Sequence, residues 1–460
     1  MTALAAGSFV WTMTLPASSS LAGLNPNGWR VLAVLTLAII LWFTMVIPAT
    51  LTSLLVVLLL STSGALTFDQ AALSLGQKEV WLVFSMLIFS AALTGHGLDK
   101  RIAYYMLMTA RGNLRQLLFM LMLFGFMLTF FMTNAFSRLS MLLPIAAGLV
   151  TTLKDRSTKG FAPALYLLIV FVPYISSTSV ITGSGGAIYA AGLFQSMLNF
   201  EWSYLQWLLM MAPISLLTLI LLWGVLVVRF KVPSGDNAEE LIPYFKSEMK
   251  QLGAMKDSEK KLLLIALLLA GLWMTSDWHG MTPAISALAA ACALFFFRLI
   301  SWKEAVTKID WGVIFMFAAG FAIADGLRIN GVVDWLFTMM PPNLNNMTAF
   351  SVAVFMLVIF TVIRIGFTNN TAMVASLMPL ALLFAQTSPH NTQWIGMITL
   401  VACSNGYFFP TQSSGSMLVY QLGSFSSRNF WNFGVLITIL MSGLTLLFAF
   451  FFWPIVGLNK

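Results

Sequence analysis

The chain has 460 residues, of which 59% are hydrophobic and 9% are charged, and its mean hydropathy is +0.89. This composition excludes a water-soluble globule and indicates a protein that folds in a lipid bilayer. The net charge of +8 does not indicate nucleic acid binding, because most basic residues lie between apolar segments, as membrane topology requires. We therefore expect a multi-pass protein of the cytoplasmic membrane with no nucleic-acid partner.

Near-continuous apolar segments follow one another along the chain, and several are about long enough to cross a bilayer as helices. They cover residues 31–47, 50–63, 80–96, 117–132, 161–180, 207–228, 261–276, 281–297, 311–327, 347–363, 395–410 and 431–455. Residues 1–28 are predicted to be a leader or a degenerate first helix, because residues 2–22 are apolar but contain Pro16 and a run of serines.

Three short motifs occur twice, roughly 230 residues apart, as expected of an internal duplication. The pairs are Leu41-Trp42-Phe43-Thr44 with Leu272-Trp273-Met274-Thr275, Lys78-Glu79-Val80-Trp81 with Lys308-Ile309-Asp310-Trp311, and Thr133-Asn134 with Thr368-Asn369. Duplication within an apolar chain is typical of secondary transporters. We predict a first repeat at 29–228, a cytoplasmic linker at 229–260 and a second repeat at 261–460.

The basic residues predict that the two repeats are inverted relative to each other. Of the 24 Lys and Arg residues, 18 lie in residues 98–116, 154–159, 229–261 and 298–308 or at Arg428. If all 18 face the cytoplasm, the first span of the first repeat begins outside and its counterpart in the second repeat begins inside. Each half then needs five crossings and one hairpin that enters and leaves on the same side. The predicted fold is an all-α polytopic membrane protein with two inverted-topology repeats.

The predicted hairpins, residues 117–153 and 347–386, have their tips near Asn134 and Asn370. A polar turn at membrane depth is tolerated only where protein or a water-filled cavity satisfies its backbone, so we expect both tips to face a site. Each hairpin precedes a run of small polar residues, from Ser176 to Gly186 and from Pro410 to Ser416. Such runs let a transmembrane helix unwind and expose its amide and carbonyl groups. Each repeat is therefore predicted to pair a re-entrant hairpin with a broken helix.

Two arginines lie within otherwise apolar segments, Arg138 just after the first tip and Arg364 just before the second. A buried arginine in a membrane is expensive, so these side chains either face a cavity or a partner, or snorkel to an interface. An enzyme is not expected, because the three histidines lie near the ends of apolar segments, which hold no carboxylate pair or nucleophile constellation.

Over about residues 29–455 the chain resembles the divalent anion:sodium symporter family, which has two inverted repeats with Ser-Asn-Thr motifs at both hairpin tips. Asn369-Asn370-Thr371-Ala372 looks like the second tip, whereas the first reads Asn134-Ala135-Phe136 in the same register, or Thr133-Asn134-Ala135 if one residue is inserted. The family's unwound Gly/Ala-Thr-Pro-Pro-Asn segments are similar to Gly183-Ser184-Gly185-Gly186-Ala187 and Gln412-Ser413-Ser414-Gly415-Ser416, with both proline pairs lost.

The resemblance implies a site for a small di- or tricarboxylate, or sulfate, between the tips and the unwound segments. Its substrate-binding residues would be Thr133, Asn134, Arg138, Gly183, Ser184, Asn369, Asn370, Thr371, Gln412, Ser413 and Ser414. Sodium would bind at Asn134, Gly183, Asn370, Thr371 and Gly415 as the coupling ion, with no other metal and no cofactor. The resemblance also implies a homodimer in the bilayer.

The predicted function is secondary active transport of these anions, by sodium-coupled symport with elevator-type alternating access. The alternative is sodium-independent exchange, in which the Arg138 guanidinium replaces the charge of a sodium ion. A non-transporting structural or receptor-like membrane protein is the remaining alternative, and a channel would need a continuous polar lining that the sequence does not provide.

Overall fold

The computed structural model describes residues 23–153, 160–234, 238, 240–339 and 347–460, and its regular elements over these residues are all helices. Eight of the helices are long and apolar enough to cross a membrane, and five further apolar helices are shorter. Eleven of the predicted apolar segments overlap one of these helices, and the segment 261–276 overlaps a further helix, Asp257–Met274, so the all-helical polytopic fold is confirmed. The prediction for residues 2–22 lies outside the described residues.

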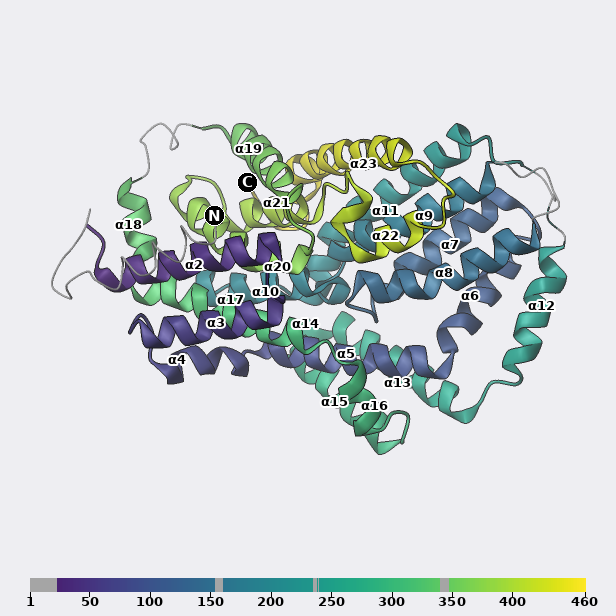
Figure 1. Ribbon diagram of the computed structural model, residues 1–460, viewed down its shortest axis with the longest axis horizontal. Helices are drawn as coiled ribbons and strands as arrows, with labels where there is room; N and C mark the ends of the chain where they lie inside the picture. Colours follow the sequence, from purple (N-terminus) through teal and green to yellow (C-terminus); the bar gives the residue numbers. More distant parts are fainter. Residues whose placement is uncertain (1–22, 154–159, 235–237, 239, 340–346) are drawn as a thin grey trace.

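Taken in chain order, the helices of the two predicted repeats can be matched by position, and most pairs are similar in length. Figure 1 labels most of them. The first half contains α2 (Pro26–Thr44), α3 (Ala49–Thr62), α4 (Phe68–Leu73), α5 (Lys78–His96), α6 (Leu98–Met108), α7 (Leu114–Leu128), α8 (Ala135–Thr152), α9 (Phe161–Ile175), α10 (Gly185–Leu198) and α11 (Tyr204–Arg229). Their counterparts are α13 (Asp257–Met274), α15 (Pro283–Phe296), α16 (Trp302–Lys308), α17 (Trp311–Ile329), α18 (Val332–Met339), α19 (Ala349–Arg364), α20 (Asn370–Thr387), α21 (Thr392–Ser404), α22 (Ser414–Tyr420) and α23 (Ser427–Leu447). The short α14 (Ser276–His279) has no counterpart, and the inversion of the halves in the membrane stays a prediction.

The two halves interlock through reciprocal contacts. Helix α3 packs on α17 of the other half, and its counterpart α15 packs on α5. Toward the centre of the molecule α10 lies against α20, and α22 lies against α8 (Figure 1). Because every contact of this kind joins one half to the other, the halves form a single packed body.

Each half contains two consecutive helices, joined by a turn, that both pack on the helix that follows them in the chain. The arms α7 and α8 both pack on α9, and the arms α19 and α20 both pack on α21. Each second arm begins at an asparagine cap: the Asn134 side chain accepts a hydrogen bond from the Phe136 amide at 2.8 Å, and Asn369 accepts one from the Ala372 amide at 3.2 Å. These caps satisfy amides that have no partner within the helix and fix where the turns end.

The segment predicted to be a solvated linker contains a packed helix, α12 (Leu241–Leu252). Leu241 and Phe245 are buried where α12 lies against α6, and α12 also touches α8. Just beyond α12, Arg101 of α6 forms a buried ion pair with Glu259, with Nε 2.6 Å from Oε2. The sequence analysis missed this helix because the alternation of charged and apolar residues in a short segment is a weak signal.

Candidate functional site

Both halves contain a helix that stops and restarts in the middle of the protein. Helix α9 ends at Ile175, two short 3₁₀ turns follow, and α10 begins at Gly185. Helix α21 ends at Ser404, and after an extended stretch and one 3₁₀ turn α22 begins at Ser414. Ser184 and Ser413 occupy the same position in the two breaks, since each hydroxyl accepts a hydrogen bond from an amide in the first turn of the helix it precedes, at 3.1 and 3.0 Å.

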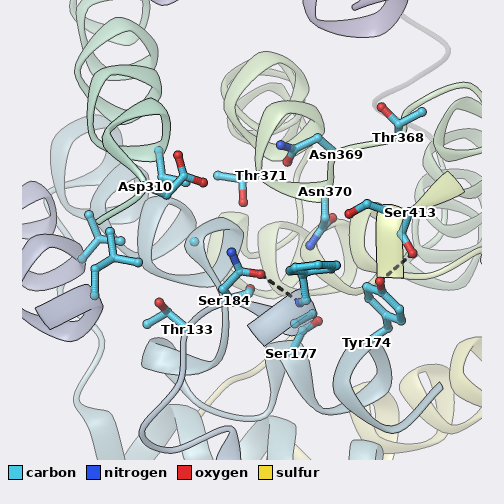
Figure 2. A pocket seen from close by; sticks show the side chains of 18 of the residues that line it. Thr133, Tyr174, Ser177, Ser184, Asp310, Thr368, Asn369, Asn370, Thr371 and Ser413 are labelled. Carbon is cyan, nitrogen blue, oxygen red and sulfur yellow. Dashed lines mark hydrogen bonds between the residues drawn. The ribbon is translucent and has the colours of Figure 1, made fainter. Parts of the chain in front are cut away.

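A cavity of about 350 Å³ lies between these breaks and the two hairpin tips. Figure 2 shows Thr133, Ser177 and Ser184 on one side of it and Asn369, Asn370 and Thr371 on the other. Eight of the predicted site residues line the cavity, namely Thr133, Asn134, Ser184, Asn369, Asn370, Thr371, Ser413 and Ser414. The volume is at the lower end of the range for small-molecule sites, about 300–1,000 Å³.

The N-termini of four helices lie at the cavity wall. Helices α8, α10, α20 and the short α22 all begin at residues that line the cavity, so their N-termini converge on it. Helix N-termini present free amide donors and a partial positive charge. No lysine or arginine is among the residues that line the cavity, and Asp310, the cap of α17, is the one charged residue among them. A small anion would therefore be held by amides, hydroxyls and carboxamides.

Three buried polar atoms in the cavity wall have no hydrogen-bond partner among the described residues. They are Ser177 Oγ, Asn370 Oδ1 and Tyr407 Oη. A buried polar atom without a partner costs about 1–3 kcal/mol. Such atoms also occur elsewhere in the described residues, but these three border a cavity, where a polar ligand could bond them.

Arg138 lies behind the cavity wall and does not line it. Its side chain is fully buried, and Nη1 donates to the carbonyl oxygens of Met132 at 3.0 Å and Gly183 at 2.8 Å. Nη2 donates to the carbonyl oxygen of Pro173 at 2.6 Å. The guanidinium thus ties the first hairpin tip to both ends of the first break. A substrate carboxylate would have to displace these carbonyls to reach it.

Arg364 and Gln412 join the second tip to the second break. Arg364 is buried, donates to the Phe367 carbonyl oxygen, and places its guanidinium 5.1 Å from the centre of the Tyr407 ring. The Gln412 side-chain oxygen accepts from the amides of Phe408 and Phe409, and its nitrogen donates to the Ile365 carbonyl oxygen at 3.2 Å. Gln412, predicted to bind substrate, does not line the cavity.

The glycines of the breaks permit close packing. A Cβ atom on Gly185 would lie 2.9 Å from Thr371 Oγ1, where α10 meets α20. A Cβ atom on Gly415 would lie 2.5 Å from a methyl carbon of Leu139, where α22 meets α8.

The structure does not place two of the predicted sodium-binding residues at the cavity. Neither Gly415 nor Gly183 lines it. Instead, the carbonyl oxygen of Gly183 accepts the hydrogen bond from Arg138 described above.

The sequence analysis missed a pair of stacked tyrosines in the wall, one from each half. The Tyr174 and Tyr407 rings are 4.6 Å apart, and the Tyr174 hydroxyl donates to Ser413 Oγ at 2.5 Å (Figure 2). Tyr174 lies in the last turn of α9 and Tyr407 lies in the extended stretch of the second break, so the two do not occupy matching positions and no repeated motif pointed to them. Asp310 and Ser177 were also missed, because only the three-dimensional contacts bring them to the cavity.

Comparison with known proteins gives the family. The family of the sodium:sulfate symporter transmembrane region matches residues 2–459. The chain belongs to this family. Among its relatives are a sodium-dependent dicarboxylate transporter of Staphylococcus saprophyticus, 24% identical over 94% of this chain and 87% of the relative, and a citrate/succinate antiporter of Escherichia coli, 23% identical over 95% and 94%. A protein of Cupriavidus necator described as a membrane protein is 25% identical over 95% of this chain and 89% of its own length.

The match confirms the resemblance found in the sequence, since it extends almost from end to end of the chain. The protein is thus a multi-pass membrane protein of a transporter family rather than an enzyme. Its named relatives include both a sodium-dependent carrier and an antiporter of small carboxylate anions. Family membership therefore supports anion transport, but it does not distinguish sodium-coupled symport from exchange.

Proposed function

We propose that this protein carries di- or tricarboxylate anions across the cytoplasmic membrane, binding them in the cavity between the two hairpin tips. The observation that carries the proposal is the convergence of four helix N-termini, each capped by Asn or Ser, on one polar cavity. Such termini bind oxyanions through amide donors without a fixed cationic side chain. In the proposed elevator-type cycle, hairpins and broken helices move together and expose the cavity to alternate sides.

We propose exchange as the coupling that the first tip supports best. The carbonyl oxygens of Met132, Pro173 and Gly183 are the acceptors that a sodium ion would use at this tip, and the Arg138 guanidinium already bonds all three. The positions after Asn134 are Ala135 and Phe136, which supply no side-chain oxygen. A permanent charge at this tip would remove the need for a sodium ion there.

Sodium-coupled symport is the second candidate, and the second tip supports it. Asn370 Oδ1 is buried and has no hydrogen-bond partner among the described residues, while its Nδ2 donates to Ser404 Oγ at 3.3 Å. A carboxamide oxygen beside the hydroxyl of Thr371 suits a hard monovalent cation. These residues would hold one sodium ion, whose charge would help neutralise the anion in the cavity.

The test uses purified protein in liposomes and measures uptake of radiolabelled succinate, citrate and sulfate. Each anion is offered with and without an inward sodium gradient, and with and without unlabelled anion inside. Uptake that requires unlabelled anion inside the liposomes and is unchanged by the sodium gradient would establish exchange. Uptake into empty vesicles driven by sodium would establish symport, whereas uptake of none of the three anions would refute the proposed substrate class.

The homodimer implied by the family resemblance stays a prediction. Its test is the mass of the detergent-solubilised protein, corrected for bound detergent, measured at concentrations above and below those used in the uptake assay.

A further inference from the structure

A second cavity, of about 630 Å³, lies at the C-terminal end of α5. Its walls are the last turn of α5 in the first half and the turn between α15 and α16 in the second half. It shares no lining residue with the first cavity. Ala91 and Gly95 in its wall continue, at four-residue spacing, the stripe of α5 on which Leu87 faces the first cavity. The two cavities therefore lie along one face of the same helix.

The second cavity is lined by cationic side chains that have no carboxylate of the described residues within ion-pair distance, although the charge of Glu304 acts on Lys308 and His96 from farther away. Arg298 and Lys308 both line it, and neither side chain makes a hydrogen bond or an ion pair with any residue in the described part of the chain. His96 uses one ring nitrogen to bond the Ala92 carbonyl oxygen at 2.9 Å. A cationic side chain that only stabilises the fold usually bonds the carbonyl oxygens at a helix C-terminus or a carboxylate. The side chains of Arg298 and Lys308 form neither kind of bond within the described chain.

The one carboxylate in the wall, Glu304, is engaged elsewhere. Its Oε2 accepts from the Ser301 amide at 2.9 Å and from the Ser301 hydroxyl at 2.7 Å, which caps α16. The bond from the Ser301 amide, followed by that from its hydroxyl, lowers the pKa of Glu304, so the carboxyl is ionised at neutral pH. The two positive charges of Arg298 and Lys308 still outnumber this single negative charge. The capping bonds hold the carboxylate at the N-terminus of α16.

The backbone at Arg298 is held in an unusual conformation. Its φ of 54° lies in the left-handed region, where residues other than glycine are uncommon. This conformation ends α15 in a common C-terminal motif, in which the Leu299 amide donates to the Leu294 carbonyl oxygen at 2.8 Å, and it fixes where the Arg298 side chain leaves the helix. Nearby, Trp302 is 58% exposed and lines the cavity, and Phe296 is 81% exposed. Exposed aromatic rings of this kind mark the level of the lipid headgroups.

We propose that this cavity is an anion site that binds a phosphate group through Arg298 and Lys308, with His96 as a further donor. The phosphate comes from an anionic lipid headgroup or from free inorganic phosphate. The basic residues around 298–308 place the site on the predicted cytoplasmic face, where anionic lipids are abundant. The bound phosphate would lie along α5 from the first cavity, but its binding does not depend on what the first cavity transports.

The test measures binding of phosphatidylglycerol and phosphatidylcholine to the full-length protein in detergent by native mass spectrometry. Wild type should retain phosphatidylglycerol in preference to phosphatidylcholine. The double variant Arg298→Gln/Lys308→Gln should bind phosphatidylglycerol roughly tenfold or more weakly, because two charge-assisted contacts are lost. The matched control Lys303→Gln removes an exposed charge from the same short helix outside the cavity and should bind like wild type.

Two further arms complete the test. Inorganic phosphate added to the wild-type complex distinguishes the sources: displacement of the lipid shows that phosphate alone suffices, and retention identifies the lipid as the occupant. The single variant Lys308→Arg preserves the charge and should bind phosphatidylglycerol like wild type. The melting temperatures of Lys308→Arg and of the double variant are measured as well, so that a difference in binding is not caused by a difference in folding. Equal retention of both lipids by wild type, or equal binding by the double variant and Lys303→Gln, would overturn the proposal.

Discussion

The two hairpin tips share a backbone plan but use their polar groups differently. Asn134 and Asn369 both cap the helix that follows, yet Ala135 and Phe136 come next at the first tip, whereas Asn370 and Thr371 come next at the second. The first tip is tied to its break by Arg138 through three carbonyl oxygens. At the second tip the carboxamide oxygen of Asn370 has no partner in the described chain.

This difference divides the work of the site between the halves. At the first tip three backbone carbonyl oxygens are already bonded by the guanidinium of Arg138, and we propose that this tip serves as a rigid clamp. The second tip retains free acceptors and is the part of the wall that a ligand or a sodium ion would complete. The two predicted repeats thus share the asparagine cap at the tip but differ in the side chains that follow it.

The largest effect is expected from removing the clamp. Arg138→Leu leaves three buried carbonyl oxygens without their donor, and hydrogen bonds to charged groups contribute about 1.5–3 kcal/mol each. We expect the protein to lose at least about 3 kcal/mol of stability and all transport, measured by thermal unfolding in detergent and by uptake in liposomes. Arg138→Lys keeps the charge without the planar fork and should be intermediate.

The matched variant at the second tip is Arg364→Leu. Arg364 donates to a carbonyl oxygen of its own hairpin and stacks on Tyr407, so its loss removes fewer links between the tip and the break. A loss of stability for Arg364→Leu as large as for Arg138→Leu would contradict the assignment of the clamp to the first tip.

The next effect tests the second tip as the open side of the site. The double variant Asn370→Ala/Thr371→Ala removes the side chains that the first tip lacks. We expect KM for the transported anion, or for sodium, to rise roughly tenfold or more, because buried polar contacts to a charged ligand are lost. Its melting temperature should change little, since Asn370 has a single long hydrogen bond to Ser404. A collapse in stability with unchanged KM would assign these residues to the scaffold.

Much of this arrangement could be predicted from the sequence because it depends on local signals. Apolar length gave the helices, the repeated Thr-Asn pairs gave the hairpin tips, and the small-residue runs gave the breaks. Eight residues of the site followed from these motifs. Arg138 was identified as unusual, but whether its side chain meets the cavity or the carbonyls behind it depends on the packing of α9 against the tip, which no local pattern encodes.

The same reasoning explains what was missed. Tyr174 and Tyr407 reach the cavity only because α9 and the second break meet across the two halves. Asp310 looks like an ordinary helix cap in the sequence, and Ser177 like a small packing residue. Contacts between segments more than 200 residues apart, such as Tyr174 with Ser413, require the tertiary fold.

A smaller effect is expected from the tyrosine pair. Tyr407→Phe removes a buried hydroxyl that has no partner in the described residues, so stability should stay level or rise slightly. If the ligand forms a hydrogen bond with this hydroxyl, the KM of the variant for the transported anion should rise roughly two- to tenfold. Tyr174→Phe is the comparison, because its hydroxyl already donates to Ser413 and its loss should lower stability. The reverse pattern, with Tyr407→Phe destabilised and Tyr174→Phe unaffected, would mean that the hydroxyl assignments are wrong.

The smallest effect distinguishes the two capping serines. Ser184→Ala and Ser413→Ala each remove a helix cap, which costs about 0.5–2 kcal/mol. Ser413 also accepts the hydrogen bond from Tyr174, whereas Ser184, in the described residues, makes its capping bond to Ala187 and no hydrogen bond to the other half. The melting temperature should therefore fall more for Ser413→Ala than for Ser184→Ala, and the double variant Tyr174→Phe/Ser413→Ala should be less destabilised than the sum of its single variants, because both remove the same bond. Strict additivity would show that the bond joining the two halves contributes nothing to stability, and the division between a clamped first tip and an open second tip would then rest on Arg138 alone.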